Sequence, residues 1–170
     1  MQKQVPYTDA KNTKYPEQVA IVIAKDREGK PNPITIGWIT PVSSEPPMLA
    51  IAVGKTRYSA ETITHSRCFT VAYPNEAMRV ATLLFGTKSG RDEDKLEKAG
   101  CPTQPATEID SVLLTDAVAN FECELESYMP AGDHIVFVGR VVASHVTDLP
   151  LDRLYTTGPN HELGGIEKKE

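Results

Sequence analysis

The chain has 170 residues, with 18 Lys and Arg against 23 Asp and Glu, which gives a formal net charge of −5. A chain of this length can form one domain around its own hydrophobic core. The acidic balance argues against the broad basic surface that nucleic acids and anionic membranes require. No apolar run reaches the roughly 20 residues that cross a bilayer. Residues 1–15 contain no apolar signal segment, so we expect a soluble, cytoplasmic protein.

The three cysteines are an odd number and form no Cys-x-x-Cys pair, which disfavours a disulfide framework or a zinc ribbon. Cys68 and Cys123 fall in apolar strand patterns and are predicted to be small core residues, whereas Cys101 is predicted to lie in a loop. We predict no metal site, because the four histidines are scattered along the chain: His65, His134, His145 and His161.

The chain is predicted to be a loose arm (residues 1–14) followed by one domain (residues 15–170), whose first part is made of strands. The β-branched run 18–25 predicts a strand covered on both faces. The turn formers after it and the strand pattern 34–40 complete a predicted hairpin. Prolines at 41, 46 and 47 predict a loop, and residues 48–53 predict another buried strand.

Two short helices are predicted in the middle of the chain. Ser59 is expected to cap the first helix, which ends near Ser66 and leads into a strand over 68–73. Asn75 is expected to cap the second. Its apolar face is predicted from the helical spacing of Ala77, Val80, Ala81 and Leu84. A charged helical turn is expected over 92–99.

Strict alternation marks residues 119–128 as a strand with one core face and one solvent face. The core face is predicted to hold Phe121, Cys123 and Leu125, and the solvent face Glu122, Glu124 and Glu126. A turn at Gly132 and Asp133 and a long strand over 134–146 follow. Since strands dominate and do not alternate regularly with helices, we predict a closed or half-closed antiparallel barrel with inserted helices.

Two cationic segments are candidate anion sites. In the first, residues 55–59 place Lys55, Arg57 and two hydroxyls just before a predicted helix start, where free backbone N–H groups favour a phosphate. In the second, Lys88 to Arg91 contain Ser89 and a glycine, and Lys95 follows. Each segment has a simpler explanation: a helix cap with solvated cations for the first, and a solvated charged loop for the second.

Polar and small residues also cluster around one strand end, at Thr35, Gly37, Trp38, Thr40 and Ser43. Gly37 would let a flat ring approach the backbone beside Trp38, the only tryptophan. The alternative is that Trp38 fills the core.

Several of these segments, in this order and spacing, resemble the flavin reductase-like FMN-binding proteins, a family that includes flavoredoxins and small flavin reductases. The resemblance covers roughly residues 15–165 and is carried by the segments 32–38, Ser43 with Pro46 and Pro47, 57–59, 69–74, 89–95 and 132–141.

The resemblance implies a mainly β (α+β) fold, a Greek-key split β-barrel that binds FMN and forms a homodimer. It implies that the flavin ring lies along the strand and loop from Thr35 through Ser43, including Ile39. It further implies a phosphate site at Arg57, Tyr58 and Ser59, with Ser89 and Lys95 as helpers. His134 would lie near the face that a nicotinamide approaches and would orient the reacting rings. A histidine satisfied by a strand carbonyl is the alternative.

Three functions remain open. The first is an oxidoreductase that passes electrons from NADH or NADPH through bound FMN to an acceptor. The second is a flavoredoxin-type carrier that receives electrons from a redox-protein partner. The third is a barrel without flavin that serves as a scaffold or small-ligand binder. The combination of Trp38, Arg57, Ser59 and Lys95 disfavours the third, and the enzyme is the function we predict.

Overall fold

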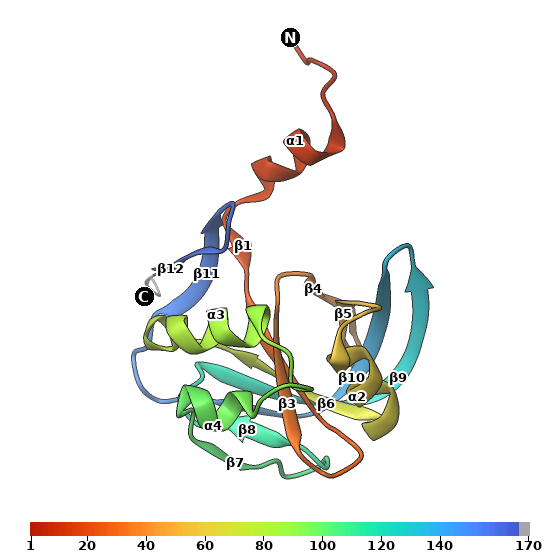
Figure 1. The fold of residues 1–170 in the computed structure, drawn as a ribbon, viewed down its shortest axis with the longest axis vertical. Helices are drawn as coiled ribbons and strands as arrows, with labels where there is room; N and C mark the ends of the chain where they lie inside the picture. Colours follow the sequence, from red (N-terminus) through yellow and green to blue (C-terminus); the bar gives the residue numbers. More distant parts are fainter. Residues whose placement is uncertain (167–170) are drawn as a thin grey trace.

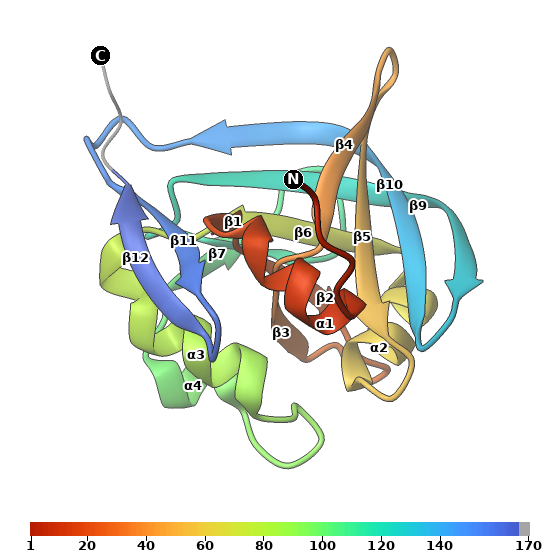
Figure 2. The ribbon, with the colours of Figure 1, turned by 90° about the horizontal axis from the view of Figure 1, so that it is seen from above.

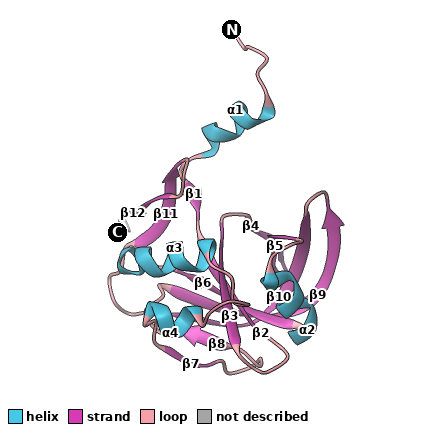
Figure 3. Cartoon of the chain, in the orientation of Figure 1, coloured by secondary structure: helices cyan, strands magenta, loops and turns pink. Residues whose placement is uncertain are grey.

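The computed structural model describes residues 1–166 as a mostly β structure with short helices (Figure 1, Figure 3). A seven-stranded antiparallel sheet in the order β3-β2-β6-β9-β10-β5-β4 forms the body. A small sheet of order β1-β11-β12 lies beside it, and β7 pairs with β8. The predicted mainly β class is confirmed. The predicted domain, 15–170, runs four residues beyond the described part of the chain.

The elements have the following bounds. The strands are β1 (Glu17–Gln18), β2 (Ala20–Lys25), β3 (Pro31–Ile36), β4 (Ile39–Ser44), β5 (Pro47–Gly54), β6 (Cys68–Tyr73), β7 (Thr103–Pro105), β8 (Val112–Leu114), β9 (Ala119–Ala131), β10 (His134–Val146), β11 (Arg153–Gly158) and β12 (Glu162–Ile166). The helices are α1 (Tyr7–Lys11), α2 (Tyr58–Ser66), α3 (Arg79–Thr87) and α4 (Lys95–Ala99), with 3-10 turns η1 (Asn12–Lys14) and η2 (Glu76–Met78).

Strand β2 has two buried faces, as predicted. Ala20, Val22 and Ala24 point into the main core, which the curled sheet and α2 enclose. Ile21 and Ile23 point the other way, into a second core that lies under α3. Cys68 and Cys123 are buried, as predicted. Helices α3 and α4 pack against β3 on the outside of the sheet, as Figure 2 shows from above.

The prediction of a single strand over 34–40 followed by a loop was wrong. The chain breaks at Gly37 and Trp38 and resumes as β4, which pairs antiparallel with β5. β4 is an edge strand, where proline is tolerated because one side needs no ladder donor. The register of the pair shifts between Pro41 and Ser43.

Two helix predictions were also wrong in detail. Ser59 does not cap α2, because the helix starts at Tyr58, and the Ser59 hydroxyl lies inside the helix and accepts a hydrogen bond from Asn32. Asn75 does cap the next segment, but that segment is the turn η2. This turn shifts the phase of α3, so its buried residues are Ala81, Thr82 and Phe85, while Val80 is exposed.

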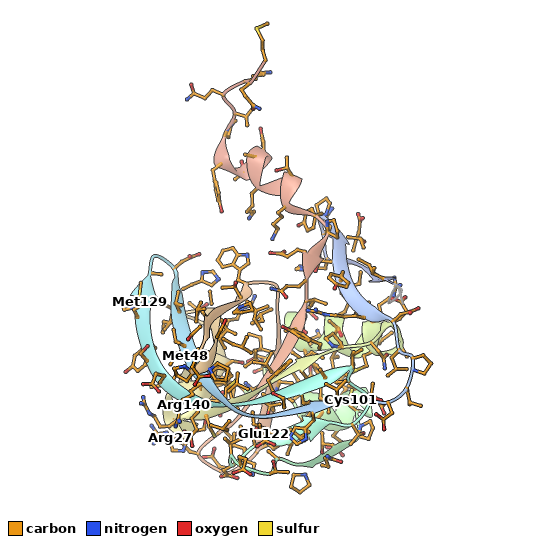
Figure 4. All side chains as sticks on the ribbon, turned by 180° about the vertical axis from the view of Figure 1, so that it is seen from behind. Arg27, Met48, Cys101, Glu122, Met129 and Arg140 are labelled. Atoms are coloured by element: carbon orange, nitrogen blue, oxygen red, sulfur yellow. The ribbon has the colours of Figure 1, made fainter. Side chains whose placement is uncertain are left out.

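The predicted solvent face of β9 contains one residue that is fully buried, Glu122. The loop before β8 covers it, and the carboxylate accepts hydrogen bonds from the backbone N–H groups of Thr107, Glu108 and Ile109, from the Thr107 hydroxyl and from His145. Figure 4 places Glu122 within the packed body and Met129 on the projecting β9–β10 hairpin. Glu124 and Glu126 are exposed, as predicted.

Residues 1–14 project from the body as an exposed arm that contains α1 and η1 (Figure 1). At the other end of the described chain, β11 pairs with β1 on one side and with β12 on the other. The β11–β12 hairpin lies alongside α3 (Figure 2). Across residues 1–166, none of the helices is long and apolar enough to cross a membrane.

Candidate functional site

The two cationic segments, separate in the sequence, meet in one cavity of about 300 Å³. The start of α2 forms one wall, and the loop between α3 and α4 forms the other. Three of the lining residues carry a positive charge at the rim: Arg57, Lys88 and Arg91. The others include Asn32, Thr56, Tyr58, Ser59, Ser89, Gly90 and Lys95. This donor set suits an anion with several oxygens.

Asn32, which is buried, lies directly against Gly90. Its Nδ2 donates to Ser59 Oγ at 2.9 Å, while its Oδ1 has no hydrogen-bond partner among residues 1–166. A Cβ atom at Gly90 would lie 2.9 Å from Asn32 Cγ and closer still to Oδ1. The absence of a side chain at residue 90 therefore leaves room for the loop backbone to approach, and this backbone covers the unpartnered Oδ1 of Asn32.

Arg91 and Tyr58 close the outer rim of this cavity. The Arg91 guanidinium lies 4.8 Å from the centre of the Tyr58 ring and forms an ion pair with Glu61. Tyr58 donates its hydroxyl to Asp26 at 3.3 Å. Burial and the negative charge of Asp26 raise the pKa of Tyr58, which therefore stays a neutral donor.

A second hollow of about 560 Å³ follows the end of β3 to the break at Gly37 and Trp38. Its floor is the backbone and side chains of residues 34–38, and its far wall is the end of β5 with Gly54 and His134. Gly54 has no side chain to fill the space between Arg57 and His134. The hollow therefore presents open backbone along one strand end, where a flat group could lie.

His134 stands at the edge of this hollow, at the start of β10. Its Nδ1 lies 2.7 Å from Asp133 Oδ1, and its ring centre lies 4.6 Å from that of Trp38. The hydrogen bond to His134 holds the pKa of Asp133 below its usual range. Because Asp133 engages Nδ1, the Nε2 atom is the nitrogen left to face the hollow.

A third hollow of about 280 Å³ shares the wall formed by residues 35–38 and lies on the other side, against α3. Thr35 donates its hydroxyl to the carbonyl of Thr82 at 2.6 Å, which fixes the strand to the helix. The tip of the β11–β12 hairpin, with Asn160 and His161, closes this hollow from above. Arg57 lines all three hollows and so marks the point where they join.

The structure brings most of the predicted residues together. Thr35, Gly37, Trp38 and His134 line the second hollow, and Arg57, Tyr58, Ser59, Ser89 and Lys95 line the first. Ile39 and Thr40 line a further hollow on the opposite side of Trp38. Ser43 lies on β4 and lines none of these hollows in the described chain. Trp38 is 43% exposed, so the alternative that it fills the core was wrong.

Sequence reasoning did not select Asn32, Asp133, Asn160 or His161 as site residues. Asn32 ended a run of turn formers and began the segment 32–38 that carried the resemblance, but no role was assigned to its side chain. Asn160 and His161 both have left-handed backbone angles, with φ of 63°, at the hairpin tip. Asn and His are among the non-glycine residues that most often adopt this conformation, so the pair was a weak local signal of a turn but not of a site.

A model of the flavin reductase like domain matches residues 12–162. The chain therefore belongs to the family of flavin reductase like domains, as the resemblance predicted. The match runs from the end of the arm to the β11–β12 hairpin and includes every residue that lines these hollows except Leu163.

Two individual relatives share about 30% of their aligned residues with this chain. A protein of Archaeoglobus fulgidus is 33% identical over 118 residues, which cover 69% of this chain and 66% of its own length. The NADH-dependent FMN reductase AsuE2 of Streptomyces nodosus is 29% identical over 138 residues, covering 78% of this chain and 70% of that protein. The chain spans 66%, 38% and 54% of the lengths of three curated relatives.

Among solved structures, a flavoredoxin from Methanosarcina acetivorans shares the fold. Its TM-score is 0.87 and the alignment covers 100% of this chain and 94% of that one, with 23% identity. The split-barrel architecture is therefore common to both chains.

Proposed function

We propose that this protein binds FMN and works as an NAD(P)H-dependent oxidoreductase of the flavin reductase type. The single observation that carries the proposal is that Arg57 joins a cationic cavity to an open strand end. A ligand with a dianionic tail and a flat ring matches that combination. The name of the relative AsuE2, an NADH-dependent FMN reductase, supports the same choice of cofactor and donor.

The residues of the first cavity fit the phosphate. Arg57, Ser89 and the loop backbone at Gly90 supply donors around one point, and the charged donors strengthen each hydrogen bond. The cavity thus matches the charge of this nucleotide's phosphate.

Residues 35–38 are assigned to the ring. The free edge of β3 offers backbone N–H and C=O groups to the ring's polar edge, and Gly37 contributes no side chain of its own. The isoalloxazine of FMN, when bound, accepts a hydride or single electrons. The role of His134 is to orient the reacting rings, because Asp133 fixes its Nδ1 and leaves Nε2 facing the hollow.

The experiment is a titration of purified protein with FMN and with riboflavin, which lacks the phosphate. Arg57→Ala should weaken FMN binding about tenfold or more, since one charge-assisted hydrogen bond contributes about 1.5–3 kcal/mol. Riboflavin binding should change much less. Lys55→Ala is the matched control: Lys55 is a nearby cation that is not part of the lining of the first cavity. Equal losses for the two ligands would refute the phosphate assignment.

A second measurement separates the enzyme from the electron carrier. Anaerobic mixing of the FMN-loaded protein with NADH or NADPH should remove the flavin absorbance on a catalytic timescale if the protein has its own nicotinamide site. Reduction only by an added redox protein would instead favour the flavoredoxin-type carrier. If the purified protein takes up no FMN at all, the result would favour the third function, a scaffold or small-ligand binder without flavin.

The protein is further proposed to form a homodimer. Large apolar side chains are exposed at the start of β4 and on the β9–β10 hairpin, namely Trp38 and Val42 beside or on β4 and Met129 on β9. A group of exposed apolar residues favours a protein interface. Light scattering should give twice the chain mass, and Val42→Glu with Met129→Glu should halve it. Val146→Glu, at an exposed apolar residue at the end of β10 far from the β9–β10 hairpin, is the control.

A further inference from the structure

The ammonium group of Lys95 is buried beneath the first cavity, although lysine is seldom buried unless it is paired. Lys95 is 4% exposed and is the first residue of α4. Its Nζ donates to the carbonyl of Pro33 and lies 3.4 Å from each of the carbonyls of Phe85 and Lys88. An ammonium has three N–H donors, so these three carbonyls account for all of them.

The three carbonyls belong to three different segments. Pro33 lies in β3, Phe85 in the last turn of α3, and Lys88 at the position that ends α3 and starts the loop to α4. Figure 1 shows α3, α4 and β3 next to one another, and their residues are in contact. The last carbonyls of a helix have no partner within it, and a cation there also meets the negative end of the helix dipole. Lys95 therefore ties the end of α3 to the strand.

The tied loop is the one that forms the outer wall of the cavity. It contains Ser89 and Gly90, whose approach to Asn32 leaves no space for a side chain. Lys88 is the residue at which this loop leaves the helix. A shift of Lys88 would move Ser89 and the loop backbone away from Arg57, on the opposite wall.

We propose that Lys95 is a positioning residue, which holds the Lys88–Arg91 loop in the conformation that completes the anion cavity, and that it is not itself a ligand of the anion. The proposal rests on the cavity being the phosphate site proposed above. It assigns the direct contacts to Arg57, Ser89 and the loop backbone.

The electrostatics of the cavity agree with this role. Burial and the nearby Arg57 lower the pKa of Lys95 to about 8, and Glu93 opposes part of this shift. Lys88 and Arg91 add positive charge on the loop side. A bound dianion would favour the charged form of Lys95. Affinity for the phosphate should therefore fall as the pH rises through 8, where the ligand-free protein starts to lose this charge.

The experiment compares Lys95→Met with Lys98→Met, an exposed lysine of the same helix that pairs with Glu93. The first readout needs no ligand: limited trypsin digestion after Lys88 and Arg91 in the ligand-free protein. Cleavage should accelerate about tenfold or more in Lys95→Met, because one charged hydrogen bond of about 1.5–3 kcal/mol is the minimum lost. Lys98→Met should behave like the wild type.

The second readout is the affinity for FMN and for riboflavin. We expect Lys95→Met to weaken FMN more than riboflavin. Unchanged loop cleavage with weakened FMN would make Lys95 a direct ligand and overturn the proposal. Faster cleavage with unchanged FMN affinity would also overturn it.

Two further measurements keep the test decisive. If Lys95→Met does not fold, as a thermal melt would show, Lys95→Arg keeps the charge and the donors. Lys95→Arg should restore at least part of the wild type's resistance to trypsin. If its loop were cleaved as fast as an unfolded chain, the proposed role of Lys95 in holding the loop would be refuted. A wild-type protein that binds no FMN would refute the proposed function alone, since the ligand-free cleavage still decides whether Lys95 holds the loop.

Discussion

Glu122→Gln replaces one oxygen of a fully buried carboxylate with an amide nitrogen. Oε1 accepts from the N–H and hydroxyl of Thr107 and from His145, and Oε2 accepts from the N–H groups of Glu108 and Ile109. Glutamine offers only one acceptor oxygen. In either orientation its NH₂ group faces N–H donors of the covering loop, and these donors are left unsatisfied.

The cost follows from the pKa of Glu122. Although burial opposes the charge, the hydrogen bonds from residues 107 and 108 and from His145 outweigh it and lower the pKa to about 2 from its usual 4.5. A difference of about 2.5 units corresponds to about 3 kcal/mol of native-state stability at neutral pH. Two unsatisfied N–H groups at about 1–3 kcal/mol each give the same order. In a domain of this size we expect the melting temperature to fall by about 6–12 °C.

The pH dependence has a definite sign. The folded-state pKa lies below the unfolded one, so the contribution is complete above pH 4.5 and is lost as the pH falls toward 2. The wild type should therefore lose stability across this window, and the difference between it and Glu122→Gln should shrink as the pH is lowered.

Thermal and urea unfolding at pH 7 and between pH 5 and pH 3 would measure both effects. Glu124→Gln is the matched control, because Glu124 lies on the same strand, is half-exposed and pairs with Arg140 at 2.5 Å. An exposed pair of that kind contributes about 0–1 kcal/mol. The reasoning would be refuted if Glu122→Gln and Glu124→Gln unfolded at the same temperature at pH 7.

Two further predictions concern the reactive side chains. His134→Ala should keep FMN bound but slow its reduction by NADH in stopped-flow mixing, with His65→Ala, at an exposed residue on α2, as the control; unchanged rates would remove the orienting role. Burial raises the pKa of all three thiols, that of Cys123 to about 12. A disulfide reagent should therefore modify only Cys101 in the native protein, and slowly, whereas in urea it should modify all three cysteines. Rapid reaction of a second thiol in the native protein would contradict the burial of Cys68 and Cys123.

The fold could be predicted where the pattern is local. The run that became β2 is apolar at every position but its ends, and it proved to have a core on each face. The edge strand β4 and the phase of α3 could not be predicted in the same way. β4 exists because β5 supplies its hydrogen bonds, and α3 is set by a 3-10 turn that the spacing of apolar residues does not reveal.

The features of the candidate site likewise divide into those that local sequence patterns predicted and those that depend on contacts between distant residues. Each cationic segment was visible in the sequence, because charge and glycine at short spacing are local signals. Their meeting depends on Asn32, which contacts Ser59 across 27 residues, and on Lys95, which reaches Pro33 across 62 residues. Glu122 was predicted to be exposed for the same reason, since only a loop more than ten residues away in sequence makes that face of β9 an interior one.

Gly90→Ala tests this long-range packing at the cavity. The added Cβ would lie 2.9 Å from Asn32 Cγ, and Asn32 is buried and held by Ser59, so neither side can yield cheaply. We expect an overpacking cost of about 1–3 kcal/mol, a displaced loop and weaker binding of FMN than of riboflavin. The same change at Gly86 meets only Thr35 Cβ at 3.4 Å and adds a better helix former, worth up to about 1 kcal/mol. Calorimetry of both ligand-free variants should therefore give shifts of opposite sign. A Gly90→Ala protein as stable as the wild type, with unchanged FMN affinity, would mean that the loop does not need its close approach to Asn32.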